Sequence, residues 1–290
     1  MLVIAFLGMG KMGRPMAYNL ASAGFRVRCW NRTPEKLKGL PSIMETHEDL
    51  RTTLTGADVV ISMLSDGSAT KKVISKLENK VLSSVKTWVE MASVLPQEAI
   101  DQSVFFKNNN VAYLDAPVSG GTVAANNKNL AIMVGGEDDI YQESIKIFEP
   151  LGKSVLVGPC GAGQLAKLAN QAIVGITIGA VAEAVLLLEK GGVNVDFVRK
   201  ELSVGFADSA ILQQHGKRMS ERNFEAGGSI KTQLKDMQNI QNTAQMFGLE
   251  LPMVDKVTDR YLALSDDPSN LEKDHSALFL ELLKRNSLAD

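Results

Sequence analysis

A glycine-rich turn between two short apolar runs constrains the fold of this chain more than any other feature. In the segment IAFLGMGKMGRPMAYNLASAGFRVRCW, Gly8, Gly10 and Gly13 follow a β-rich run and open an amphipathic helical pattern, which Gly24 ends before a second β-rich run. In such a unit the first glycine allows a tight turn, the second lets backbone approach a pyrophosphate, and the third lets the helix pack closely on the strand. The helix N-terminus then faces the phosphates. We therefore expect a dinucleotide to bind at Gly8, Met9, Gly10, Lys11, Met12 and Gly13.

The order of β-rich and helical segments predicts two domains. Short β-rich runs alternate with helical patterns as far as about residue 160, at 3–7, 25–30, 57–63, 87–91, 111–115, 130–134 and 154–157. Such alternation is typical of a mostly parallel sheet covered by helices. All later segments have helical periodicity, at 163–190, 194–203, 208–220, 230–247, 253–264 and 276–284. We predict an α/β Rossmann-type domain over 1–161 and an all-α substrate and oligomerisation domain over 162–290, joined by the long interdomain helix.

Charge, hydropathy and cysteine content exclude several classes of protein. The 31 basic and 33 acidic residues give a net charge of -2, so nothing favours nucleic acid or an anionic membrane as partner. The apolar run 172–182 ends at Glu183 and is shorter than the roughly 20 residues that span a bilayer. Cys29 and Cys160 have neither CxxC nor Cys/His spacing, which argues against a disulfide framework or a zinc site. The N-terminal apolar run lacks a basic leader, which argues against a signal peptide. Together with the cysteine pattern and the short apolar run, this predicts a soluble, cytoplasmic protein without a metal site.

The residues after the second β-rich run bear on which cofactor is bound. A site selective for NAD usually has Asp or Glu here to bind the ribose 2′-hydroxyl, whereas this chain has Asn31, Arg32 and Thr33. Without a carboxylate to repel it, a 2′-phosphate can be held by a guanidinium and small polar donors. NADP is therefore favoured, with NAD possible at lower affinity. The alternative is that Arg32 is a solvated surface residue with no role in binding.

Two further segments lie at predicted strand ends. Loops at the carboxyl edge of such a sheet meet the nicotinamide and ribose, so we include Met63, Leu64, Ser65 and Ser93 in the cofactor site. Serine and aspartate at strand ends are also ordinary helix caps, which is the competing interpretation.

A second glycine-containing loop, DAPVSGGT at 115–122, follows another β-rich run. Successive backbone N–H groups through Ser119, Gly120 and Gly121 favour a small concavity for a substrate carboxylate, because the glycines have no side chains to block it. A plain turn explains the same glycines equally well.

Lys167 lies near the start of the most apolar long stretch of the chain, 161–190. An ammonium beside so much aliphatic surface loses hydration, and this loss requires a partner or a task. Asn170 follows three residues later and therefore shares a helical face with Lys167.

Five motifs in order resemble those of the β-hydroxyacid dehydrogenase family. That family includes 3-hydroxyisobutyrate dehydrogenases, tartronate semialdehyde reductases and glyoxylate/succinic semialdehyde reductases. The resemblance covers essentially the whole chain. The motifs are the glycine loop continued to Asn31-Arg32-Thr33, MLSD at 63–66, DAPVSGG at 115–121, GxGQxxKLxNQ at 161–171 and KD at 235–236.

The resemblance implies an NADP-preferring oxidoreductase that interconverts short carboxylate-bearing aldehydes and their hydroxyacids. It further implies that Lys167 is the general acid/base, whose ammonium donates a proton to the developing alkoxide as hydride reaches the carbonyl carbon. Desolvation by the apolar helix is expected to lower the pKa of Lys167 from about 10.4. The alternative is a lysine anchored only by a structural carboxylate.

Other residues take roles from the same resemblance. Asn170 is similar to an asparagine that lines the family's site, where it can hydrogen-bond the substrate or orient Lys167. Lys235 is similar to a second lysine that approaches the cofactor from the helical domain, although a solvated helix lysine would have the same sequence. The family assembles through this domain, and residues 172–188 are too apolar to be left in water, so we expect a homo-oligomer, a dimer or a tetramer.

Departures from the family pattern concern substrate shape more than chemistry. Glu90 and Ala92 stand where many members have Asp-Met-Ser-Thr, although Ser93 retains a hydroxyl. Asn127 replaces a common glycine, and Gly228 falls where members often carry a large apolar residue. MLSD and NRT resemble the glyoxylate/succinic semialdehyde branch, whereas DHSA at 274–277 resembles the bacterial hydroxyisobutyrate-like branch, so the subfamily stays open.

Three other functions compete with this one. An imine reductase shares the architecture but usually has an acid or a tyrosine where Lys167 stands. A non-catalytic NADP-binding sensor would need loss of the lysine or of the anion loop, and both are present. The chain is too short for 6-phosphogluconate dehydrogenase, which has a much larger helical domain.

The three histidines, His47, His215 and His275, have no metal-ligand spacing and fit no Ser/His/Asp arrangement. We interpret all three as surface or capping residues. The 12 methionines are expected to fill gaps in the core.

Overall fold

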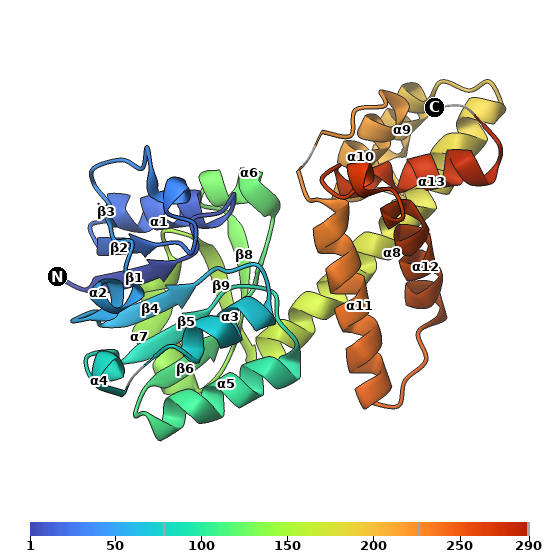
Figure 1. The fold of residues 1–290 in the computed structure, drawn as a ribbon. Helices are drawn as coiled ribbons and strands as arrows, with labels where there is room; N and C mark the ends of the chain where they lie inside the picture. The colour runs from blue at the N-terminus through green and yellow to red at the C-terminus, as the bar shows by residue number, and fades with distance from the viewer. Residues whose placement is uncertain (78, 226, 289–290) are drawn as a thin grey trace. The chain divides into compact units, whose positions relative to one another are not determined.

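The computed structural model describes residues 1–77, 79–225 and 227–288 (Figure 1). The chain divides into two compact units, Met1–Lys167 and Leu168–Asp290. The division lies inside one long helix, so this helix contributes its first turns to the first unit and the remainder to the second. Each unit is described by itself.

The first unit is built on a single sheet, in which the described residues form nine strands. Their order is β3-β2-β1-β4-β5-β6-β8-β7, with β9 paired to β8. The strands from β3 to β6 are parallel, β8 is antiparallel to β6 and β7, and β9 is parallel to β8. The strands are β1 Val3–Leu7, β2 Arg26–Trp30, β3 Glu45–Thr46, β4 Val59–Ser62, β5 Thr87–Glu90, β6 Ala112–Asp115, β7 Val118–Ser119, β8 Leu130–Gly135 and β9 Gly152–Gly158.

Helices cover both faces of this sheet (Figure 1), because successive residues of the buried central strands point to opposite faces. In β1, Phe6 joins the core shared with α1, α6 and α7, whereas Leu7 joins the core shared with α2 to α5. In the second core Trp88 stacks on Phe106 with ring centroids 4.5 Å apart. The helices are α1 Gly13–Ser22, α2 Leu50–Leu54, α3 Gly67–Ile74, α4 Asn79–Leu82, α5 Pro96–Asn108, α6 Gly121–Asn126 and α7 Asp138–Phe148, with the short 3-10 helix η1 Pro34–Leu37.

The second unit is helical. The long α8, Ala162–Lys190, packs against α11 and α12, and the core of the unit includes Ile178, Met237 and Tyr261. A Cβ at Gly175 would clash with Met237, so a glycine here lets α8 and α11 approach closely. The remaining helices are α9 Val195–Glu201, α10 Ala210–Ser220, α11 Ile230–Met246, α12 Pro252–Ser265 and α13 Leu278–Arg285, with the 3-10 helices η2 Leu202–Val204, η3 Pro268–Asn270 and η4 His275–Ala277.

Length and composition alone would allow α8 to cross a membrane, so the expectation that its apolar run is too short is wrong on that point. In the structure 39% of the most apolar 18-residue stretch of this helix is buried inside the chain. Its buried side chains, among them Ile178 and Ala182, belong to the core of the second unit. Core helices of soluble proteins can have the same length and apolar composition. These two properties are therefore weak evidence for a membrane span.

The predicted fold class is confirmed: an α/β Rossmann-type sheet is followed by helices in the described part of the second unit. All seven β-rich runs form strands and all six later segments form helices. The two-residue strands β3 and β7 were not predicted. β7 changes the description of the 115–122 loop, because Val118 and Ser119 pair with β8 before the turn begins. Cys29 and Cys160 are free thiols, as expected.

Candidate active site

The glycine loop has the geometry that a dinucleotide needs. Gly8 has φ +108° and its N–H donates to the carbonyl of Trp30 at 2.8 Å. A Cβ at Gly8 would clash with the carbonyl of Met63, and a Cβ at Gly13 would clash with the carbonyl of Gly8. A Cβ at Gly10 would meet no atom within 4 Å, so this backbone borders open space. The loop is thus packed tightly at its first and third glycines and open at its second, which fits a pyrophosphate at Gly10 and the start of α1.

The segment after β2 lies beside the glycine loop and also holds it by a hydrogen bond. The side-chain oxygen of Asn31 accepts the N–H of Met9 at 2.9 Å, and its amide nitrogen donates to the carbonyl of Thr33 at 3.0 Å. Asn31 is half-buried, whereas Arg32 and Thr33 are exposed. Asn31 therefore positions the loop, and Arg32 presents its guanidinium at the end of β2.

The segments after β4 and β5 lie along the same carboxyl edge of the sheet. The N–H of Met63 donates to the carbonyl of Leu7 at 2.8 Å, which holds the segment beside the end of β1. Met63 and Leu64 are half-buried and Ser65 is exposed. Ser93, after β5, is half-buried, and Glu90, the last residue of β5, is fully buried. Burial raises the pKa of the Glu90 carboxyl to about 7.

Two buried side chains hold the beginning of α8. The carboxylate of Asp115, at the end of β6, accepts the N–H groups of Gly161 and Gln164 at 2.7 and 2.8 Å. The Gln164 carboxamide accepts the N–H of Val94 at 3.0 Å and donates to the carbonyl of Ala92 at 2.9 Å. The first turn of α8 is thereby attached to the segments after both β5 and β6.

Lys167 follows Gln164 by three residues on α8, so it lies on the same side of this helix one turn later. The residue is buried, with 9% of its surface exposed. The attachments of Gln164 and Asp115 hold the helix turn that precedes Lys167. The predicted lowering of the Lys167 pKa stays a prediction.

The predicted substrate loop has a conformation that requires glycine. Gly120 and Gly121 have φ +122° and +63°, in the left-handed region, and α6 begins at Gly121. Ser119 is half-buried at the end of β7. A Cβ at Gly120 would clash with Ala124, whereas a Cβ at Gly121 would meet no atom within 4 Å. The backbone at Gly121 is therefore accessible, as a carboxylate-binding turn requires.

The two predicted site residues of the helical unit converge on one carboxylate. The amide nitrogen of Asn170 donates to the Gln171 side-chain oxygen at 2.9 Å, and Gln171 donates to Asp236 at 2.7 Å. The ammonium of Lys235 lies 3.3 Å from the other oxygen of Asp236, which is 1% exposed. The glycine loop, Ser93, the 119–121 loop and Lys167 belong to the first unit, and Asn170 and Lys235 belong to the second.

Comparison with known proteins agrees with this geometry. Residues 3–159 match the family described as the NAD binding domain of 6-phosphogluconate dehydrogenase, and residues 161–282 match the NAD-binding family of NADP-dependent 3-hydroxyisobutyrate dehydrogenase. The chain is 36% identical to the 2-hydroxy-3-oxopropionate reductase of Escherichia coli K12, and the alignment covers 99% of each protein. The chain belongs to the β-hydroxyacid dehydrogenase family. The predicted family is thereby confirmed, and with it an NAD(P)-dependent oxidoreductase of hydroxyacids and their aldehydes.

Solved structures place this β-hydroxyacid dehydrogenase among the same relatives. The 3-hydroxyisobutyrate dehydrogenase of Mycobacterium tuberculosis, determined with L-serine, has a TM-score of 0.88 and 26% identity, covering 97% of this chain and 99% of that one. An imine reductase from Pseudomonas sp. has a TM-score of 0.66 and 20% identity, covering 97% of this chain and 99% of that one. The second likeness shows a shared fold alone.

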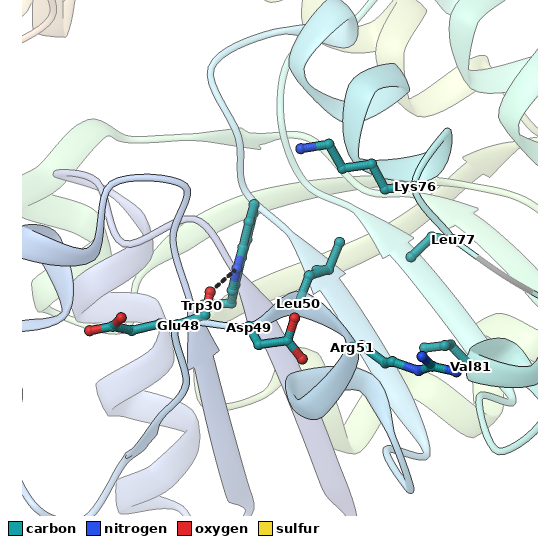
Figure 2. Close-up of a pocket in the computed structure, with 8 residues that line it drawn as sticks. All are labelled: Trp30, Glu48, Asp49, Leu50, Arg51, Lys76, Leu77 and Val81. Carbon is teal, nitrogen blue, oxygen red and sulfur yellow. Dashed lines mark hydrogen bonds between the residues drawn. The ribbon is translucent and has the colours of Figure 1, made fainter.

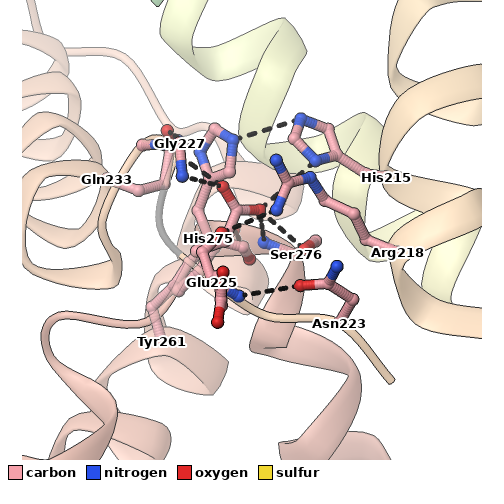
Figure 3. A network of polar contacts seen from close by, with 11 residues as sticks. His215, Arg218, Asn223, Glu225, Gly227, Gln233, Tyr261, His275 and Ser276 are labelled. Carbon is pink, nitrogen blue, oxygen red and sulfur yellow. Dashed lines mark hydrogen bonds and ion pairs between the residues drawn. The ribbon is translucent and has the colours of Figure 1, made fainter. Parts of the chain in front are cut away.

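The prediction that the histidines are surface or capping residues is wrong for two of them. In this dehydrogenase the His215 and His275 rings meet edge to face, with centroids 4.6 Å apart (Figure 3). Asp274 lies beside them with no exposed surface. The three side chains offer atoms within 4.8 Å of one another, which is close enough to consider a metal. However, Asp274 already accepts hydrogen bonds from the N–H groups of Gly227, Gly228 and Ser276, so its oxygens are occupied by donors.

A cavity of about 300 Å³ in the first unit of this dehydrogenase lies outside the predicted site (Figure 2). The indole N–H of Trp30, inside the cavity, donates to the carbonyl of Glu48 at 3.0 Å. None of the predicted site residues lines this cavity. Its lining is Trp30, Glu48, Asp49, Leu50, Arg51, Lys76, Leu77 and Val81.

Sequence reasoning missed the residues that position the site. Gln164 and Gln171 were part of a quoted motif, and Asp236 was part of the KD pair, yet none was given a role. The sequence pattern that could have identified them is a polar residue within an otherwise apolar helix, or next to a lysine that already had a role. Asp115 stood at the start of the substrate loop motif, and burial raises its pKa to about 6.

Proposed function

We propose that this dehydrogenase reduces short aldehydes that carry a carboxylate, and oxidises the corresponding hydroxyacids in reverse. The observation that carries the proposal is the buried Lys167, one turn after the Gln164 and Asp115 attachments. A bound nicotinamide supplies the hydride, which adds to the carbonyl carbon. The Lys167 ammonium donates a proton to the carbonyl oxygen, leaving a neutral amine that solvent protonates again. Candidate substrates are succinic semialdehyde, glyoxylate, methylmalonate semialdehyde and tartronate semialdehyde.

We further propose that the cofactor is NADP in preference to NAD. No carboxylate stands at residues 31–33, and the exposed Arg32 can pair with a 2′-phosphate. Met63, Leu64, Ser65 and Ser93 would border the ribose and nicotinamide. From the helical unit, Lys235 would approach the cofactor.

The substrate would be held by its carboxylate. The backbone at Gly120 and Gly121, which is open at Gly121, would supply donors to the carboxylate together with Ser119, and Asn170 would supply a carboxamide to the reacting group. These assignments follow the motifs at 119–121 and 167–170.

The apolar surface of the second unit supports a homo-oligomer, a dimer or a tetramer. On α8, Ile173 is 68% exposed and Leu187 is 75% exposed in the single chain. Contact with a second copy would bury these side chains and gain about 25 cal/mol for each Å² covered. We also place the protein in the cytoplasm, where two free thiols would stay reduced.

The experiment measures NADPH oxidation by the purified protein with each of the four aldehydes. Propionaldehyde, which has no carboxylate, serves as the control. The proposal predicts turnover with at least one carboxylate-bearing aldehyde and little with propionaldehyde. Bound NADPH without turnover of any of them would favour the imine reductase or the non-catalytic sensor instead.

A further inference from the structure

A chain of polar side chains leads from Asn170 into the interior of the helical unit. Gln171 accepts a hydrogen bond from Asn170 and donates to Asp236, as described above. Its amide nitrogen also lies 3.3 Å from the side-chain oxygen of Gln233. Gln233 returns a hydrogen bond from its own amide nitrogen to the carbonyl of Gln171 at 3.4 Å. Asp236 and Gln233 are each 1% exposed, so water does not replace these contacts.

The chain continues into the histidine cluster (Figure 3). His275 Nδ1 lies 3.3 Å from the Gln233 side-chain oxygen, and His275 Nε2 lies 3.2 Å from His215 Nε2. His215 Nδ1 then faces the Oδ1 atom of Asp274 at 3.4 Å. In the described part of the chain no hydrogen bond of regular geometry reaches this nitrogen, and its contact with Asp274 is an ion pair.

The direction of every hydrogen bond follows from the carboxylate of Asp236, which can only accept. Gln171 must therefore turn its amide nitrogen towards Asp236, and the same nitrogen meets the oxygen of Gln233. Because that oxygen accepts, His275 has to place a proton on its Nδ1. The amide oxygen of Gln171 is then left to accept from Asn170.

The three contacts made by the histidines require one proton more than two neutral imidazoles carry. Gln233 Oε1 with His275, His275 with His215, and His215 with Asp274 Oδ1 each need one proton. A neutral imidazole has one N–H, so two of them supply two protons. The complete arrangement therefore contains one imidazolium opposite an ionised Asp274.

The geometry places the extra proton on His215, because its Nδ1 faces the Asp274 carboxylate. Burial lowers the pKa of His275 to about 4, although the neighbouring Asp274 carboxylate opposes this shift. Burial alone would raise the pKa of Asp274, but the contact with His215 and the hydrogen bonds from Ser276 hold it well below its usual range. Asp236 also faces His275, and Lys235 pairs with Asp236. Tyr261 donates its hydroxyl to the His275 carbonyl at 3.1 Å.

We propose that His275 is a positioning residue that fixes the carboxamide of Asn170 through Gln233 and Gln171. The carboxylate of Asp236 sets the direction of the hydrogen bonds along the chain, and one proton, held between His215 and Asp274, completes them at the far end. When that proton is lost at higher pH, the His215 contact with Asp274 or the His275 contact with Gln233 loses its donor. Where His275 loses its donor, the Gln233 carboxamide is held, among the residues that the structure describes, by Gln171 alone, which weakens the support that reaches Asn170 through Gln171. The effect on catalysis rests on the proposed function of Asn170.

The test follows histidine and Asn170 side-chain signals by NMR in the full chain, labelled with ¹⁵N at histidine and asparagine, from about pH 5 to 9. The Asn170→Ser spectrum identifies the Asn170 signal. We expect one imidazolium and one neutral ring protonated on Nδ1 at low pH, and Asn170 signals that shift with the midpoint of the histidines. Two neutral rings at every pH, or Asn170 signals that stay constant through the titration, would overturn the proposal.

A kinetic arm uses two variants. Gln233→Leu breaks the chain between His275 and Gln171, so kcat/KM should fall about tenfold, the size expected for one lost hydrogen bond, and Asn170 should no longer follow the histidines. His47→Gln, in the other unit and 3.8 Å from Glu45, should change neither. Unchanged kcat/KM in a folded Gln233→Leu would contradict the positioning role. If the wild type turned over no aldehyde, the proposed function would fail while the NMR signals still decided the positioning.

Discussion

Asp115 accepts the backbone N–H of Gln164 at 2.8 Å, which joins the end of a sheet strand to the first turn of the longest helix. This contact spans 49 residues of sequence and is buried. Lys167 follows on the next turn of that helix. The chemistry proposed for Lys167 therefore depends on a carboxylate that need not touch the substrate.

Replacing Asp115 by Asn should destabilise the protein and lower turnover. A carboxamide has one acceptor oxygen, so one of the N–H groups of Gly161 and Gln164 would lose its partner, at a cost of about 1–3 kcal/mol. Urea unfolding at pH 7.5 measures the loss. The control is Asp101→Asn, because Asp101 is exposed and accepts a hydrogen bond from the side chain of Gln97 on the same helix. Equal stability of the two variants would mean that the attachment is unimportant.

The contribution of Glu90 to the free energy of unfolding should fall as the pH rises. Burial raises the pKa of the Glu90 carboxyl from 4.5 in the unfolded chain to about 7 in the folded protein. Its contribution to stability is therefore fully present below the pKa of the unfolded state and is lost as the pH rises through the pKa of the folded state. Relative to Glu90→Gln, the wild type should lose about 2 kcal/mol of unfolding free energy between about pH 5 and 8. Denaturant unfolding of both proteins at the two pH values checks this, and parallel pH dependences would argue against a buried titrating carboxyl.

Two glycine variants should separate folding from cofactor binding. A methyl group at Gly13 would clash with the Gly8 carbonyl, so Gly13→Ala should unfold at a lower temperature. A methyl group at Gly10 meets only open space, so Gly10→Ala should keep the wild-type melting temperature and bind NADPH at least tenfold more weakly, roughly 1.4 kcal/mol. Calorimetry of melting and of NADPH binding measures both quantities. Binding of NADPH by Gly10→Ala as tight as by the wild type would contradict the placement of the pyrophosphate at this loop.

Arg32→Ala should weaken NADPH much more than NADH. Only NADPH carries the 2′-phosphate, and losing one charge-assisted hydrogen bond costs about 1.5–3 kcal/mol. The dissociation constants of NADPH and NADH are measured for each protein by fluorescence titration. Their ratio compares the two cofactors on the same protein, so NADH binding serves as the internal control. An equal loss for both cofactors would show that Arg32 supports the loop and does not select the phosphate.

The elements of the fold were predictable where the periodic pattern was long. The apolar runs of β1 and β4 and the helical periodicity of α8 and α11 extend over enough residues to define a strand or a helix. The strands β3 and β7 have two residues each, and two residues carry no period. Their existence depends on pairing with β2 and β8, which is a tertiary contact.

The site was predictable as motifs but not as a network. Gly8, Lys167 and Asn170 stand in motifs whose spacing is local, so sequence alone points to them. The histidine pair joins residues 60 apart, and Gln171 reaches Asp236 over 65 residues. Contacts at such separations depend on how helices pack, which neither spacing nor composition encodes.

Lys167→Met tests the central claim most directly, because methionine keeps the unbranched chain and removes the ammonium. Turnover of the preferred aldehyde and the NADPH dissociation constant would be measured on the same preparation, with melting temperature as the check on folding. We predict that kcat falls by about 10²–10⁴, the range for loss of a general acid, while NADPH binding changes little. A folded Lys167→Met enzyme with kcat near that of the wild type would contradict the assignment of Lys167 as the proton donor.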